Sequence, residues 1–123
     1  MIYTSYFKMC NKIPGGYSIY PKPPAWFIGS VAGDIVPEDD MYRKIKRNEI
    51  TKKQFADYYL ENILFQHKPE DLLQEYDGKT IFGWSADDTY DCRFIFTQYI
   101  NYYLGNVVRE LTKREIELGI RND

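Results

Sequence analysis

Residues 80–111 decide the fold class, and they read TIFGWSADDTYDCRFIFTQYINYYLGNVVREL. The stretch opens on a short apolar run, Thr80–Trp84, that is typical of a buried strand. Cys92–Leu104 carries a wide apolar face at helical spacing and is followed by glycine, which predicts a helix with a defined end. Two valines within Asn106–Leu111 indicate a further strand. A strand, a helix and a strand in this order predict parallel strands joined by a right-handed crossover.

The rest of the chain continues this alternation of strand and helix signals. Pro21, Pro23 and Pro24 exclude a helix or a central strand around them, so we expect an ordered loop as far as Pro37. The other expected strands are Ile2–Phe7 and Tyr17–Tyr20, and Met41–Arg47 is expected to form a short helix. Three more helices are expected: one begins with a capping box of Thr51 and Gln54, one begins at Pro69, and one begins with Thr112 and Glu115 and runs to Leu118. We predict a single α/β domain over residues 1–123, with a small, mostly parallel sheet of about four strands flanked by helices.

The charge balance bears on nucleic-acid binding. A formal net charge of −2 gives no overall basic field of the kind that holds proteins on nucleic acid. A nucleic-acid ligand would therefore depend on a local basic patch, although a solvated helix face is the simpler interpretation of the one basic cluster, which acidic residues interrupt. That cluster consists of Arg43, Lys44, Lys46, Arg47, Lys52 and Lys53.

The cysteines and the apolar segments indicate the compartment. Cys10 and Cys92 lie far apart in the chain and neither belongs to a CxxC pair, so we expect free thiols rather than a disulfide framework or a zinc site. No apolar stretch approaches the ~20 residues that span a bilayer, and the first residues lack the pattern of a signal peptide. We expect no membrane association and a cytoplasmic protein.

The candidate site lies where ligands bind in open α/β sheets, beyond the carboxyl ends of the strands. Trp84 and Ser85 follow the predicted strand, and Arg93 stands in the first turn of the long helix, where free amide groups and the helix dipole favour an anion. Tyr6 ends the first strand at the same edge, and aromatic rings there suit a flat ligand. The predicted ligand-binding residues are Tyr6, Trp26, Trp84, Ser85 and Arg93.

Four further residues at this edge are candidates for catalysis. Asp87, Asp88 and Asp91 could cap the helix, repel a phosphate, or bind a metal ion or an amine, and their spacing is not diagnostic of a metal site. Cys92 lies where a thiolate would be stabilised by the helix dipole, with a buried, inert thiol as the alternative. The only histidine, His67, lies in a different part of the chain and supplies no neighbouring base. The sequence specifies neither a metal nor a cofactor.

Segments spread over nearly the whole chain resemble, in the same order, the short, phage-associated branch of the domain of unknown function 488 family. The segments that carry the resemblance are Ile2–Phe7, Pro24-x-Trp26, Ile35–Pro37, the helix around Phe55-x-x-x-Tyr59, and Ile81–Leu111. The resemblance implies an α/β fold with its site at the start of the long helix. It also implies a virus-encoded protein in the host cytoplasm, with nucleotides or nucleic acids as ligands.

The chain departs from that family at the residues that would do chemistry. Members carry a strand ending in cysteine and an aromatic residue, then an acidic residue, and a Cys-His-Arg-His run that opens the helix. In this register Gly83 takes the place of the cysteine, Trp84 that of the aromatic and Ser85 that of the acidic residue. Asp91–Phe94 takes the place of the run, where only Arg93 matches in kind. The family's thiol and imidazole groups are thus absent.

Two functions follow as alternatives. The first is a binding or interaction protein, such as a viral accessory factor, that recognises a nucleotide-like ligand or a host protein through aromatic side chains and Arg93. The second is a diverged enzyme of nucleotide or nucleic-acid metabolism that uses the aspartates. Tyrosines on the predicted outer face of Cys92–Leu104 also favour a homodimer.

Overall fold

The computed structural model describes residues 1–13 and 15–118. Its strands are β1 (Ile2–Tyr6), β2 (Gly16–Ser18), β3 (Gly29–Val31), β4 (Thr80–Gly83) and β5 (Val108–Glu110). Its helices are η1 (Phe7–Lys12, 3₁₀), α1 (Asp39–Lys46), α2 (Lys52–Tyr58), which continues as a π-helical turn η2 (Tyr59–Ile63) and a 3₁₀ turn η3 (Leu64–Gln66), α3 (Pro69–Tyr76), α4 (Cys92–Leu104) and α5 (Lys113–Leu118).

The strands form one sheet in the order β3-β2-β4-β1-β5, and every ladder between described strands is parallel. β1 lies between β4 and β5, with Thr4 opposite Ile81 on one side and opposite Glu110 on the other. Helix α4 therefore crosses over β1 to connect β4 with β5. The predicted α/β class, the parallel sheet and the crossover unit of residues 80–111 are confirmed.

The sheet has five strands rather than about four, because the region predicted as a loop up to Pro37 contains β3. This strand runs beside β2 with Gly29 opposite Gly16. A side chain on Gly29 would overlap the Gly16 carbonyl oxygen, so the close pairing depends on glycine. The sequence Gly-Ser-Val of β3 is poor in strand-forming residues, which is why the pattern of the chain did not reveal it.

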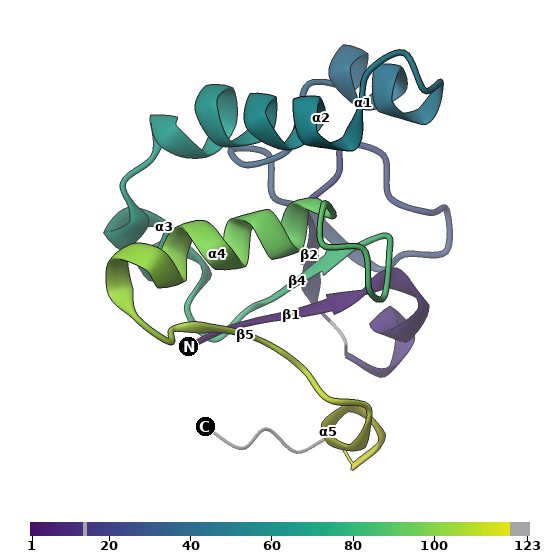
Figure 1. Ribbon diagram of the computed structural model, residues 1–123. Coiled ribbons are helices and arrows are strands. Elements are labelled where there is room, and N and C mark those ends of the chain that lie inside the picture. Colours follow the sequence, from purple (N-terminus) through teal and green to yellow (C-terminus); the bar gives the residue numbers. More distant parts are fainter. Residues whose placement is uncertain (14, 119–123) are drawn as a thin grey trace.

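Both faces of the sheet are covered, as Figure 1 shows: α1 to α4 lie on one side, and η1 and α5 on the other. Helix α4 lies nearest the sheet on its side and buries an apolar face that includes Ile95, Phe96 and Ile100. On the opposite side Phe7 stacks on Phe82 with ring centroids 6.4 Å apart. Apolar side chains therefore pack against both faces of the sheet, and this packing holds the carboxyl end of β4 in place.

The predicted helix signals are also confirmed. Thr51 and Gln54 form a reciprocal capping box at the start of α2, and Thr112 and Glu115 do the same at α5. Pro69 begins α3. Within residues 1–13 and 15–118, no helix has the length and apolar character needed to span a bilayer.

Candidate ligand-binding pocket

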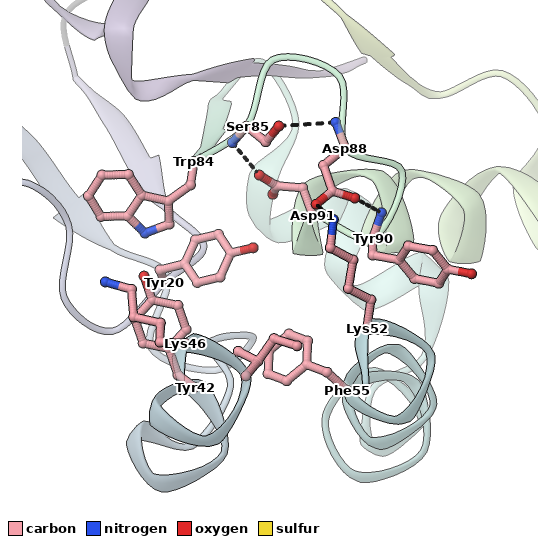
Figure 2. A pocket seen from close by; sticks show the side chains of 11 residues that line it. Tyr20, Tyr42, Lys46, Lys52, Phe55, Trp84, Ser85, Asp88, Tyr90 and Asp91 are labelled. Carbon is pink, nitrogen blue, oxygen red and sulfur yellow. Dashed lines mark hydrogen bonds and ion pairs between the residues drawn. The ribbon is translucent and has the colours of Figure 1, made fainter. Parts of the chain in front are cut away.

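A cavity of about 380 Å³ opens at the carboxyl end of β4, between the β4–α4 loop and helices α1 and α2. Figure 2 shows the polar groups of the loop on one side and the side chains of the two helices on the other. The predicted residues Trp84, Ser85, Asp88 and Asp91 line it. The remaining lining residues are Tyr20, Tyr42, Ile45, Lys46, Lys52, Phe55 and Tyr90.

Asp91 occupies the amino-terminal end of α4 and serves as its cap. Its Oδ1 accepts a hydrogen bond from the Arg93 amide at 3.1 Å, and its Oδ2 accepts one from the Ser85 amide at 2.7 Å. Gly83 lies directly beneath, where any side chain would overlap the carboxylate. Burial raises the pKa of the Asp91 carboxyl, while the amides and Arg93 oppose that rise. The protein's own carboxylate thus fills the position where we expected a ligand anion.

Arg93 is fully buried and does not line the pocket, in contrast to its predicted place among the ligand-binding residues. Its guanidinium donates to both carboxylate oxygens of Glu110, at 3.0 and 2.8 Å, and to the backbone oxygens of Ser85 and Ala86. Nη1 also lies 3.2 Å from Asp91 Oδ2. These contacts occupy the donors on both sides of the guanidinium. Arg93 therefore fixes the β4–α4 loop rather than presenting donors to a ligand.

The three candidate aspartates do not converge. Asp88 accepts a hydrogen bond from Lys52 Nζ at 2.8 Å, which lowers the pKa of the Asp88 carboxyl. Asp87 is exposed, with its Oδ1 3.4 Å from the Ser85 hydroxyl. Asp91 points inward as the helix cap. Among the described residues, no three His, Cys, Asp or Glu side chains are grouped to hold a metal ion.

The Cys92 side chain is fully buried, which matches the inert alternative rather than a reactive thiol. Burial raises the pKa of this thiol well above its ordinary value, although a hydrogen bond with Tyr20 opposes the shift. The Cys92 amide donates to the Tyr20 hydroxyl at 3.0 Å, so the start of α4 is tied to the loop after β2. His67 is remote from this edge and contacts the Asp34 carbonyl oxygen through Nε2 at 2.9 Å.

Aromatic rings form most of the pocket wall. Tyr20 and Tyr42 pack with centroids 5.1 Å apart, and Lys46 Nζ lies 4.9 Å from the Tyr42 ring and 5.5 Å from the Trp84 ring. Burial is the main cause that raises the pKa of Tyr42 to about 12. A hydrogen-bond contact with Trp84 opposes this rise in the pKa of Tyr42, although the Tyr42 hydroxyl makes no hydrogen bond of normal geometry within the described part of the chain. Because the hydroxyl oxygen is buried, a ligand in the pocket would contact the Tyr42 ring rather than this oxygen.

The two remaining predicted residues lie outside this pocket. Tyr6 is half-buried, and its ring centroid is 5.9 Å from the Arg93 guanidinium carbon. Trp26 is 58% exposed and lines a second cavity of about 550 Å³ on the far side of Trp84. The predicted set therefore divides between a pocket, a buried ion pair and a neighbouring cavity.

Sequence reasoning missed the wall that α1 and α2 contribute. Lys46 and Lys52 belong to the basic cluster that we interpreted as a solvated helix face, and Phe55 to an apolar helical stripe. The interruption of the basic residues by apolar Ile45, which also lines the pocket, is the one signal that could have indicated a partly buried face.

The comparisons with known proteins leave the site's geometry as the main guide to function. No family model, curated protein or solved structure matches this chain. The resemblance to the domain of unknown function 488 family accordingly stays a prediction.

Proposed function

We propose that the protein binds a nucleotide-like ligand, a flat ring carrying an anionic group, in the pocket between the β4–α4 loop and helices α1 and α2. The observation that carries the proposal is the position of Lys46 over the rings of Tyr42 and Trp84. A cation fixed beside aromatic walls suits a ligand that combines a stacking ring with negative charge.

The size and shape of the pocket support this class of ligand. A volume of about 380 Å³ lies in the range of small-molecule sites, roughly 300–1,000 Å³. Stacking of a base on an aromatic side chain contributes about 1–3 kcal/mol.

The charges of the pocket also indicate where the anionic group would bind. Asp91 closes the amino-terminal end of α4, so an anion is excluded from the helix terminus itself. Lys52 is already paired with Asp88, whereas Lys46 contacts only aromatic faces among the pocket residues. Lys46 is therefore the residue that we expect to contact the phosphate of the ligand.

The hydrogen bonds and ion pairs of the pocket carboxylates support binding better than catalysis. Asp91 is held by two amides and Arg93, and Asp88 by Lys52, so neither is positioned as a free general base. The lining residues among those described include neither cysteine nor histidine. Since the pocket is concave and lined by side chains from four segments, the loop after β2, α1, α2 and the β4–α4 loop, a small ligand also suits it better than a host protein.

Calorimetric titration with AMP, GMP, CMP and UMP tests the proposal. We expect at least one of them to bind, and Lys46→Gln to weaken that binding on the order of tenfold, or about 1.4 kcal/mol. Lys44→Gln is the matched control, because Lys44 is on the same helix, pairs with Asp40 and does not line the pocket.

Three results would contradict the proposal. One is the absence of binding by all four mononucleotides, and another is an equal effect of Lys46→Gln and Lys44→Gln. The third is conversion of a bound nucleotide to a product, measured by chromatography. If Asp88→Asn abolished that conversion, the enzymatic alternative would be favoured.

A further inference from the structure

Trp84 lines two cavities. Its side chain lines the nucleotide pocket and also the second cavity, which is formed by Phe7, Lys8, Asn11 and Trp26. The Phe7 ring meets the indole edge-on at a centroid distance of 4.8 Å and holds it in place. The indole remains 39% exposed, so ligand groups can reach it from both cavities.

The second cavity has the same chemical character as the first. It offers an exposed indole from Trp26, a cation from Lys8 and an amide from Asn11. Large exposed aromatic side chains that gather at a hollow mark a binding site more often than a plain surface. Together the two cavities contribute two indoles and two lysines: Trp26 and Lys8 line the second cavity, and Lys46, which lies over the Trp84 ring, lines the first.

The loop that carries Trp26 is anchored through the next residue. The next residue, Phe27, packs edge-on against Phe7 at 5.3 Å and against Phe82 at 5.7 Å. The Phe27 amide donates to the Pro24 carbonyl oxygen at 2.9 Å, and β3 follows directly. An anchored loop loses less conformational entropy when a ligand binds to it.

We infer that the two cavities bind two neighbouring bases of one ligand, with the phosphate that joins them passing Trp84 between Lys46 and Lys8. The inference rests on the proposed function, because the first base occupies the nucleotide pocket. The ligand class is two bases linked through phosphate, either as a free dinucleotide or as one step within a single strand. The acidic net charge of the chain is compatible with it, since the contacts are local and stacking supplies much of the affinity.

Titration with the 5′-phosphorylated homodinucleotides pApA, pGpG, pCpC and pUpU, beside the four mononucleotides, tests the inference. Linking two subsites raises affinity, and we expect the best dinucleotide to bind on the order of tenfold or more tightly than its mononucleotide. Trp26→Leu should remove that advantage and leave mononucleotide binding unchanged. Ile28→Ala is the matched control, because Ile28 is exposed on the same loop and lines neither cavity.

The outcomes separate this inference from the proposed function. Equal affinity for dinucleotide and mononucleotide, or a dinucleotide affinity unaffected by Trp26→Leu, would overturn the inference while mononucleotide binding still supports the pocket. Absence of all binding would overturn both. A ten-nucleotide homopolymer of the preferred base distinguishes the two sources: equal or tighter binding than the dinucleotide indicates a strand, and weaker binding indicates a free dinucleotide.

Discussion

Arg93 binds Glu110 through both sides of its guanidinium, with Nε donating to Oε1 at 3.0 Å and Nη2 to Oε2 at 2.8 Å. Arg93 lies in the first turn of α4 and Glu110 ends β5, so the pair joins the two ends of the crossover unit. The Thr4 hydroxyl also donates to Glu110 Oε1, at 2.6 Å, from the strand between β4 and β5. Since the same guanidinium holds the β4–α4 loop, the shape of the pocket depends on this pair, in which Arg93 is fully buried and Glu110 is partly exposed.

Arg93→Lys should lower the free energy of unfolding by about 2–4 kcal/mol, because lysine retains the charge but cannot donate in a fork. Urea denaturation measures the change. Arg43→Lys is the control, since Arg43 pairs with Asp39 at the surface and its replacement should cost less than about 0.5 kcal/mol. Equal, small effects of the two substitutions would show that Arg93 does not hold the loop.

Gly83→Ala should destabilise the protein by about 1–3 kcal/mol, because the added methyl group overlaps the Asp91 carboxylate and displaces the helix cap. Gly33→Ala is the control, because a methyl group there meets no atom within 4 Å. Thermal unfolding of the two variants gives the comparison. If Gly83→Ala were as stable as the wild type, Asp91 could not be seated over Gly83.

Both thiols should react slowly with a disulfide reagent in the native protein and fast in denaturant. Burial raises the pKa of Cys92 and also that of Cys10, so the thiolate is scarce at neutral pH, and neither side chain is accessible. The reagent releases a coloured thiolate when it reacts, and the rate of that release measures the reaction. In Cys10→Ser, Cys92 is the only thiol that can react. Fast, stoichiometric modification of native Cys10→Ser would restore Cys92 as a catalytic candidate.

Stability should fall as pH rises from about 5 to 8, in part because of Glu75. A hydrogen bond with the Asp34 carboxyl raises the pKa of Glu75 to about 7. A carboxyl whose pKa is raised on folding contributes stability that is present below its unfolded pKa and lost as pH rises through its folded pKa. Glu75→Gln should therefore flatten the profile over that range, as followed by urea denaturation at each pH.

The control for that profile is Glu49→Gln, which removes an exposed carboxyl remote from the pair. His67 and Tyr76 also contact Asp34, so the comparison is made between variants rather than on the wild-type slope alone. Parallel profiles for Glu75→Gln and the wild type would contradict the shared hydrogen bond.

The position of the pocket could be predicted from local patterns. A buried strand ending at Gly83 and a helix beginning at Cys92 place the intervening loop at the carboxyl edge of a parallel sheet, whatever the rest of the chain does. For that reason Trp84, Ser85, Asp88 and Asp91 were found.

The partners of those residues could not be predicted, because they depend on tertiary packing. An arginine in the first turn of a helix has the same local pattern whether it faces solvent or pairs with a glutamate that comes 17 residues later. The wall of the pocket likewise comes from α1 and α2, whose lysines give no sign in the sequence of which rings they will contact. Trp26 and Trp84 were predicted as parts of one site, whereas the structure places Trp26 on a second cavity that shares Trp84 with the first.

The central claim is that the cavity beside Trp84 is a ligand site, and tryptophan fluorescence tests it most directly. The chain has two tryptophans, so Trp26→Phe leaves Trp84 as the only indole. Titration of this variant with the four mononucleotides should give saturable quenching by at least one of them, weakened when Lys46→Gln is added. Emission from Trp84 that stays unchanged, or changes without saturation, for all four would contradict the claim.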